Sequence, residues 1–394
     1  MINLVPFGST CNLQNGRAFK PEEWSVTGTP IIRIQNLNDE SKPFNYCNFE
    51  IEERFHVSSG DLLFSWSGTP GTSFGAFFWN RGKGFLNQHI FRVDVDEKEI
   101  CKNYLRYAIN SKINLIIDQA HGGVGLKHIT KGKLEAIEIP LPPLSEQKRI
   151  AAILDKADAI RRKRQQAIQL ADDFLRAVFL DMFGDPVTNP KGWGRVSLRD
   201  IIMDWTPGVT IQPSDFTDNG FHVLHKGAVQ RNGRIEIDQR KKTFTSTEFA
   251  KANSRAVIDS EYLAVNLRDL VPTGPSIGLV ADLSVYGSKE YLLAYGAYGF
   301  KVDRNKIVPD YLIALTNDSG FRREFARVWV GSTQIHIRKD DFFDLEIPFP
   351  DFECQKKYKL IVESVRKISA SKMKKFDGDK FFFSLSQEAF RGEM

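Results

Sequence analysis

The chain has 394 residues, of which 42% are apolar and 26% charged, and its net charge is +5 at pH 7. This composition excludes a collagen-like, low-complexity or largely disordered chain, and the length favours two or three domains. So small a net charge does not indicate nucleic-acid binding by itself, so the placement of the basic residues has to decide that question.

The cysteines and the hydropathy pattern indicate a cytoplasmic, soluble protein with no membrane partner. The four cysteines are far apart in sequence and form no C-x-x-C pair, so neither a disulfide framework nor a metal cluster is expected. No apolar run of about 18 residues occurs, and the N-terminus lacks the basic stretch and apolar core of a signal peptide.

Short strands and turns are predicted for roughly the first 140 residues. Residues 31–34, 61–66 and 90–95 are β-prone runs, and a Gly-Thr-Pro-Gly turn follows at 68–71. A helix is expected over 102–110. Pro140 and the proline two residues later then end this globular part, because proline cannot continue a central strand.

A long helix is predicted next. Ser145 is a favourable N-cap, Glu146 complements the helix dipole, and no Gly or Pro occurs again until Gly184. About 38 helical residues would span about 57 Å. Apolar residues recur at alternating spacings of three and four, which predicts a coiled-coil seam. The seam contains Ile150, Ile153, Ala157, Ile160, Arg164, Ala167, Ala171, Phe174 and Val178.

The second half of the chain repeats the first. Shifted by 208 positions, residues 123–148 align without gaps on 331–356 with ten identities, including His128 with His336 and Gln147 with Gln355. The second copy also carries an insertion of about 16 residues that includes residues 230–242, and such loop-rich differences on one scaffold suit two recognition surfaces.

The seam recurs after the second copy, so two long helices are expected to cover each other. Its members there are Tyr358, Ile361, Val365 and Ile368, followed by Lys372 at the position of Arg164. Gly378 favours a break, with a separate short helix over 380–391.

We therefore predict an α+β fold of two tandem α/β domains, each with its own recognition surface. A long antiparallel two-helix coiled coil with pseudo-two-fold symmetry would separate them. The expected divisions are a first domain over 1–143, a central spacer helix over 144–184, a second domain over 185–352 and a C-terminal spacer helix over 353–394.

No catalytic or metal-binding motif is found in the sequence. It contains neither the Asn-Pro-Pro-aromatic motif of amino-methyltransferases nor a phosphate-binding loop. His222 and His225 are three apart, but no Cys or acidic ligand lies near them at metal spacing, so they are interpreted as strand or turn residues.

Basic and polar residues in loops are the candidates for DNA contacts. Arginines and lysines in a Gly-containing loop suit phosphates, and Arg also pairs bidentately with guanine. The aromatic residues of the first half are mainly expected in the core, with a minority lining a groove, and the turns at 122–125 and 331–334 either face DNA or are plain turns. The candidates are Ser67, Thr69, Ser73, Arg81, Lys83, Lys127, Arg231, Arg234, Arg240, Lys241, Lys242, Thr333 and Gln334.

Five segments resemble the specificity subunit of Type I restriction-modification systems. They are PIIRI at 30–34, GDLLFSWSG at 60–68, IPLPPLSEQKRIAAILD at 139–155, FLDMFGDP at 179–186 and AFRGE at 389–393. The resemblance spans essentially the whole chain. Residues 348–352 and Gly378 depart from the family's pattern, so the resemblance supports the docking of a second modification subunit less strongly than that of the first.

The resemblance implies a non-catalytic subunit whose two recognition domains each read one half of a split site in double-stranded DNA. The helices would also dock two modification (methyltransferase) subunits, with restriction (translocase/nuclease) subunits completing the complex. No cofactor would bind this chain: S-adenosylmethionine belongs to the modification subunit, and ATP and Mg belong to the restriction subunit. The alternative is a protein-interaction scaffold of the same architecture without DNA binding.

The inserted loop gives a first prediction. Replacing Arg240, Lys241 and Lys242 by Ala is expected to weaken DNA binding and to lower the salt slope by about one for each phosphate that the chain then no longer neutralises. A salt titration of binding measures the slope, and an unchanged slope would assign these residues to a solvated surface.

Overall fold

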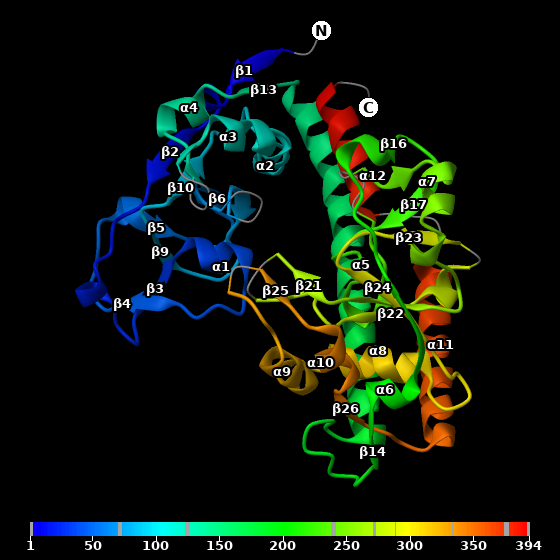
Figure 1. Cartoon of the computed structure of the whole chain (residues 1–394). Helices are drawn as coiled ribbons and strands as arrows, with labels where there is room; N and C mark the ends of the chain where they lie inside the picture. Colours follow the sequence, from blue (N-terminus) through cyan, green and yellow to red (C-terminus); the bar gives the residue numbers. More distant parts are fainter. Residues whose placement is uncertain are drawn as a thin grey trace. The chain divides into compact units, whose positions relative to one another are not determined.

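The computed structural model describes the chain except residues 1–2, 70–72, 123–126, 238–241, 271–272, 288, 333, 374–377 and 392–394 (Figure 1). The chain divides into two compact units, which we call the first and the second unit. The first consists of Met1–Gln165 with Lys375–Met394, and the second of Gln166–Lys374. Helix α5 (Leu144–Phe183) contributes its N-terminal half to the first unit and its C-terminal half to the second.

The first unit consists of short strands and helices. Its strands are β1 (Leu4–Pro6), β2 (Asn12–Asn15), β3 (Thr29–Ile32), β4 (Asn45–Cys47), β5 (His56–Val57), β6 (Leu62–Ser65), β7 (Ser67–Gly68), β8 (Gly75–Phe78), β9 (Gly84–Leu86), β10 (Ile90–Asp94), β11 (His121–Gly122), β12 (Lys127–His128) and β13 (Glu138–Pro140). Its other helices are α1 (Ile34–Asn38), α2 (Lys102–Ser111), α3 (Ile113–Gln119), α4 (Lys131–Glu135) and α12 (Gly378–Arg391).

The second unit has the same kind of composition. Its strands are β14 (Arg195–Ser197), β15 (Ile202–Pro207), β16 (Phe216–Thr217), β17 (Phe221–Leu224), β18 (Phe244–Thr245), β19 (Val257–Ile258), β20 (Leu263–Asn266), β21 (Arg268–Asp269), β22 (Val280–Asp282), β23 (Tyr291–Leu293), β24 (Ala297–Val302), β25 (Ile335–His336) and β26 (Glu346–Pro348). Its other helices are α6 (Leu198–Ile201), α7 (Thr247–Ala252), α8 (Pro309–Asn317), α9 (Ser319–Arg327), α10 (Lys339–Phe343) and α11 (Phe352–Met373).

The strand topology of the first unit recurs in the second, as the internal repeat predicts. A four-stranded sheet has the order β2-β10-β6-β8 in one unit and β15-β24-β20-β22 in the other. A second sheet in each unit contains a parallel pair, β3 with β9 in the first unit and β17 with β23 in the second. The first strand of each unit pairs antiparallel with the last, β1 with β13 and β14 with β26.

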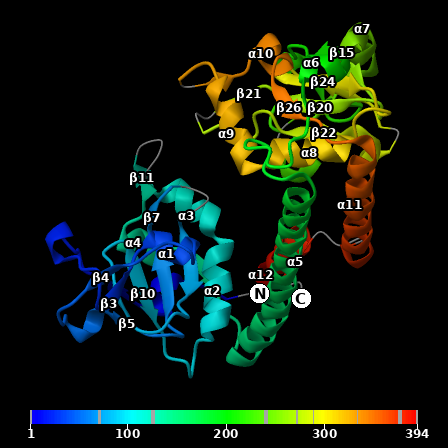
Figure 2. The same cartoon turned by 90° about the horizontal axis from the view of Figure 1, so that it is seen from below.

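The central strands β6 and β20 divide two layers of core. All four residues of each strand are buried, and alternate side chains of a strand point to opposite faces. Leu62 and Phe64 pack in the cluster that contains residues of α2, whereas Leu63 packs with Ile32 and Trp79 under the second sheet. Figure 2 shows α2 along one side of the first unit's strands.

Each long helix is tied to its domain by a buried glutamine in its first turns. Gln147 Oε1 accepts from the Cys101 amide at 2.9 Å, and its Nε2 donates to the carbonyl oxygens of Pro142 at 2.9 Å and Glu99 at 3.2 Å. Gln355, its counterpart in the repeat, accepts from the Val308 amide at 2.9 Å and donates to a neighbouring proline carbonyl. Each glutamine thus fixes the direction of its long helix relative to two parts of the domain: the end of the last strand, and the segment before α2 or α8.

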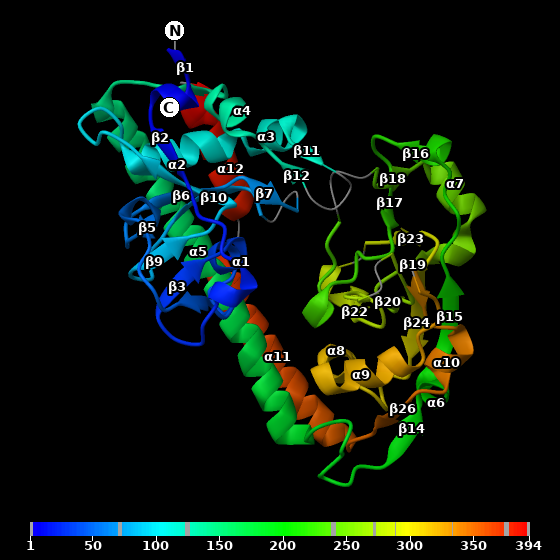
Figure 3. The ribbon, with the colours of Figure 1, turned by 90° about the vertical axis from the view of Figure 1, so that its left-hand side faces the viewer.

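The helix prediction is confirmed in extent. Helix α5 has 40 residues, and the sequence after the second copy forms two helices, α11 and α12. In the second unit the N-terminus of α11 lies beside the last turns of α5 (Figure 3), where the rings of Phe179 and Tyr358 are 5.9 Å apart. In the first unit Ala389 of α12 is buried in the same cluster as Ile150 and Leu154 of α5.

The structure corrects part of the predicted seam. Ile160, Phe174 and Ile368 are 55%, 53% and 58% exposed, so their assignment to a buried seam is wrong for this chain alone. Ile150, Ala157 and Tyr358 are buried, and Ile153, Val178, Ile361 and Val365 are half-buried. The reason is that α5 and α11 bury side chains against their own domains near the helix ends, at Leu154, Phe179 and Val362, rather than along one continuous stripe.

The glutamine tie predicts a stability effect. Gln147→Leu is expected to lower the free energy of unfolding by at least about 2 kcal/mol, because a partly buried amide N–H and two carbonyl oxygens lose their partner. Chemical denaturation of the full chain measures the change. Gln165→Leu, at an exposed position of the same helix, is the matched control and is expected to have little effect.

Candidate nucleic-acid interface

Several predicted contacts of the first unit meet at one strand edge. Strand β7 pairs with β12, which places Ser67 opposite His128 and Gly68 opposite Lys127. Thr69 is exposed, and the Ser73 amide donates to the Thr69 carbonyl oxygen at 3.1 Å, so these two residues lie side by side. Residues separated by about 60 positions in sequence are therefore neighbours, although Ser67 is itself buried.

Arg81 and Lys83 lie elsewhere in the first unit, between β8 and β9. The Arg81 guanidinium donates to the carbonyl oxygens of Asn36 and Glu40 and stands 4.6 Å from the ring centroid of Trp79. These contacts use its donors within the domain, which favours a structural role for Arg81. Lys83 is exposed.

The predicted contacts of the second unit differ in their surroundings. Arg231 is exposed on a 3₁₀ turn, whereas Arg234 Nη2 donates to both carboxylate oxygens of Asp172 on α5, at 2.8 and 2.9 Å. Lys242 is exposed, and its carbonyl oxygen lies 2.9 Å from Nε2 of His225. Gln334 is exposed immediately before β25. Arg240, Lys241 and Thr333 lie outside the described residues.

Two clusters at strand ends join residues that are far apart in the sequence. In the second unit the guanidinium carbon of Arg268 lies 4.8 Å from the ring centroid of Tyr295, which is half exposed. In the first unit the rings of Trp66 and His89 are 5.3 Å apart, and burial, followed by the charge of Arg33, lowers the pKa of His89. The sequence did not predict these clusters, because strand pairing alone brings their members together.

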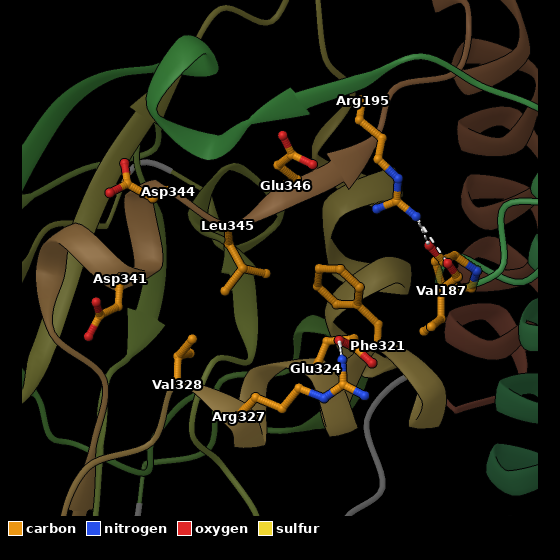
Figure 4. Close-up of a pocket in the computed structure, with 11 residues that line it drawn as sticks. Val187, Arg195, Phe321, Glu324, Arg327, Val328, Asp341, Asp344, Leu345 and Glu346 are labelled. Carbon is orange, nitrogen blue, oxygen red and sulfur yellow. Dashed lines mark hydrogen bonds and ion pairs between the residues drawn. The ribbon is translucent and has the colours of Figure 1, made fainter.

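A cavity of about 420 Å³ opens elsewhere in the second unit, between β14, β26, α9 and α10 (Figure 4). Its charged lining is mostly acidic, with Arg195 and Arg327 against four carboxylates. Arg195 donates to the Val187 carbonyl oxygen at 3.0 Å, and Arg327 is paired with Glu324. Negative charge repels a phosphate backbone, so this cavity is unsuited to DNA. The carboxylates are Glu324, Asp341, Asp344 and Glu346.

The described part of the chain contains no group of His, Cys, Asp and Glu side chains arranged to hold a metal ion. Among the helices described, none is both long enough and apolar enough to cross a membrane. His222 lies on β17 with its ring 4.7 Å from that of Phe244.

The family model of the Type I restriction modification DNA specificity domain matches the chain twice, over residues 4–170 and 190–375. The chain therefore belongs to this family of Type I restriction-modification specificity subunits, and the tandem arrangement of its domains is confirmed. The description of the family names DNA specificity.

Named relatives and a solved structure agree with this assignment. The specificity subunit of the Type I restriction enzyme MjaVIII from Methanocaldococcus jannaschii is 25% identical over 342 residues, or 83% of this chain and 76% of the relative. That of EcoBI from Escherichia coli is 25% identical over 60% of this chain and 54% of the relative. The crystal structure of the S subunit from M. genitalium has the same fold, with a TM-score of 0.58 at 15% identity over 99% of this chain and 96% of that one.

The two loop arginines give a paired prediction. Arg231→Ala is expected to lower the salt slope of DNA binding by about one, because an exposed cation is removed, whereas Arg234→Ala is expected to leave it unchanged, since Asp172 already neutralises that charge. Equal slopes for both variants and the wild type in a salt titration would remove Arg231 from the interface.

Proposed function

We propose that this chain is the subunit that gives a Type I restriction-modification complex its DNA specificity, each of its two domains reading one half of a bipartite site in double-stranded DNA. The observation that carries the proposal is the recurrence of one strand topology in two units, each tied to a long helix by an equivalent buried glutamine. Two domains with one frame but different loops can read two different sequences.

The spacer helices are proposed to act as a ruler. Domains 1–143 and 185–352 would be held by helices 144–184 and 353–394, which would form an antiparallel coiled coil relating the domains by a pseudo-two-fold axis. Packing inside each unit supports this proposal. In the second unit the start of α11 contacts the end of α5. In the first unit the guanidinium carbon of Arg161 on α5 lies 5.5 Å from the ring centroid of Phe382 on α12. Two readers on the same side of a duplex favour half-sites centred about 10 base pairs apart.

The exposed apolar side chains on the helices are proposed to dock two modification subunits. Leu170 and Phe174 on α5 and Leu360 and Ile368 on α11 are each more than half exposed. Large apolar side chains clustered on a helix surface are typical of protein interfaces. The occupant that we propose for this surface is the modification subunit that the family implies. Because the C-terminal segment forms two helices, α11 and α12, its surface differs from that of the continuous helix α5.

The reactions are proposed to belong to the partners. The modification subunits would bind S-adenosylmethionine and transfer the methyl group, and the restriction subunits would use ATP and Mg for translocation and cleavage. This chain would contribute recognition and spacing only, as a non-catalytic subunit that binds neither group. The alternative is a protein-interaction scaffold. Such a scaffold would assemble with a modification subunit but would not shift DNA in a gel.

The ruler predicts the effect of a helix insertion. Four residues inserted after Gln166 lengthen α5 by about 6 Å, close to the rise of two base pairs. We expect binding-site selection by the assembled complex to return a changed gap between half-sites, or no binding. Replacing Gln165 and Gln166 by Ala without changing the length is the control and is expected to keep the gap. The same gap at undiminished affinity in the insertion variant would show that α5 does not set the spacing.

A further inference from the structure

The two units have one turn at the same place in their topology. In the first unit it connects β9 to β10 over residues 87–89, and in the second it connects β23 to β24 over 294–296. Each turn follows the strand of the parallel pair and begins with an isolated parallel bridge, Arg17 with Asn87 and Val209 with Ala294. The turns are therefore structural equivalents with different side chains.

Two cations crowd the turn of the second unit. A Cβ atom added at Gly296 would lie 3.3 Å from Cδ of Lys226 and 3.4 Å from Cδ of Arg268, so both side chains lie against this glycine. Gly296 has a φ of +94°, which favours glycine and leaves room for them. Within the described residues neither cation has a carboxylate partner. Two cationic side chains that meet at one turn raise the local positive potential, which favours a bound anion.

Asn266 adds an unused hydrogen-bonding group beside the same turn. It ends β20 two residues before Arg268, pairs across the sheet with Ala297 and is fully buried. Its side-chain oxygen and nitrogen both lack a partner among the described residues. A buried amide without partners is unfavourable, so a ligand that offers hydrogen bonds would stabilise this site.

The turn of the first unit carries amide and aromatic groups instead. Gln88 Nε2 lies 3.1 Å from Nε2 of His89, whose ring packs against Trp66. Trp66 Nε1 and His89 Nδ1 are buried and lack partners in the described structure. Strand β7, which begins one residue after Trp66, pairs with β12, so this turn lies near the edge that carries Lys127.

We propose that these two equivalent turns are the base-reading elements of the two domains. In the second unit Arg268, stacked on Tyr295, reads a base edge while Lys226 neutralises a phosphate. In the first unit the amide of Gln88 reads a base edge, supported by His89 and Trp66. Arg pairs bidentately with guanine and Gln with adenine, so each domain has a reader suited to a different base. The inference rests on the proposed DNA recognition and assigns it to particular residues.

The test is site selection from a pool of random-sequence duplexes by this chain assembled with its modification subunits. Arg268→Ala is expected to relax the preference at a position of one half-site and to lower affinity about tenfold, while the other half-site is unchanged. Gln88→Ala is expected to do the same to the opposite half-site. The retained half-site in each case shows that the variant is folded.

Two further variants separate reading from charge. Arg268→Lys keeps the charge, so we expect the salt slope to stay near the wild-type value while the base preference disappears, since lysine lacks the planar fork. Arg255→Ala removes an exposed cation of the second unit away from the turn and is the matched control, with both half-sites retained. If Arg268→Ala abolishes all binding, the Arg268→Lys variant is the deciding test. An unchanged base preference of Arg268→Lys would overturn the inference.

Failure of the inference is distinct from failure of the proposed function. If the wild-type complex selects no bipartite site, the proposed function is wrong. If it selects one and both Arg268→Ala and Gln88→Ala retain every base preference at full affinity, only the assignment of the two turns is wrong.

Discussion

A buried glutamine side chain at the start of each long helix is the contact on which the rest of the molecule depends. Gln147 and Gln355 are 1% and 0% exposed, and each joins the helix to two segments of its own domain. A tyrosine hydroxyl adds a second link, from Tyr104 to the Pro140 carbonyl oxygen and from Tyr311 to that of Pro348, at 2.8 and 2.7 Å. Polar groups placed in a core are satisfied in one geometry only, so they fix the helix to the domain more specifically than apolar packing does.

The two units keep this frame and differ around it. The long helix contributes a charge of opposite sign to the junction in each unit. In the first unit Asp155 of α5 accepts hydrogen bonds from α2, whereas in the second unit Arg366 of α11 is paired with Asp310 of α8 at 2.7 Å. Burial raises the pKa of Asp310, and Arg366 opposes that effect. The same helix-to-domain junction is therefore made with different chemistry, which fits two copies that diverged while the frame stayed constant.

In the function that we propose, recognition and assembly would use different parts of the chain. The polar candidates for DNA contact lie in loops and at strand ends, whereas the exposed apolar side chains that we propose for docking lie on the helices α5 and α11. Loops tolerate changes of sequence because they carry little of the core, so specificity can change without loss of the helices. A chain built in this way suits a subunit that selects the DNA and leaves the reactions to its partners.

The sequence by itself determined the repeat, the long helix from Leu144 to Phe183, the helix after Gly378 and the family, because hydrophobic periodicity, caps and local motifs are contained in consecutive residues. It did not determine which side chains α5 buries: the predicted seam includes Phe174, which is exposed, and leaves out Phe179, which is buried against Tyr311 and Tyr358. Nor did it find Arg268 beside Tyr295, since these residues meet only after β20 has paired with β24. Local patterns determine the elements, whereas long-range pairing decides which side chains share a surface.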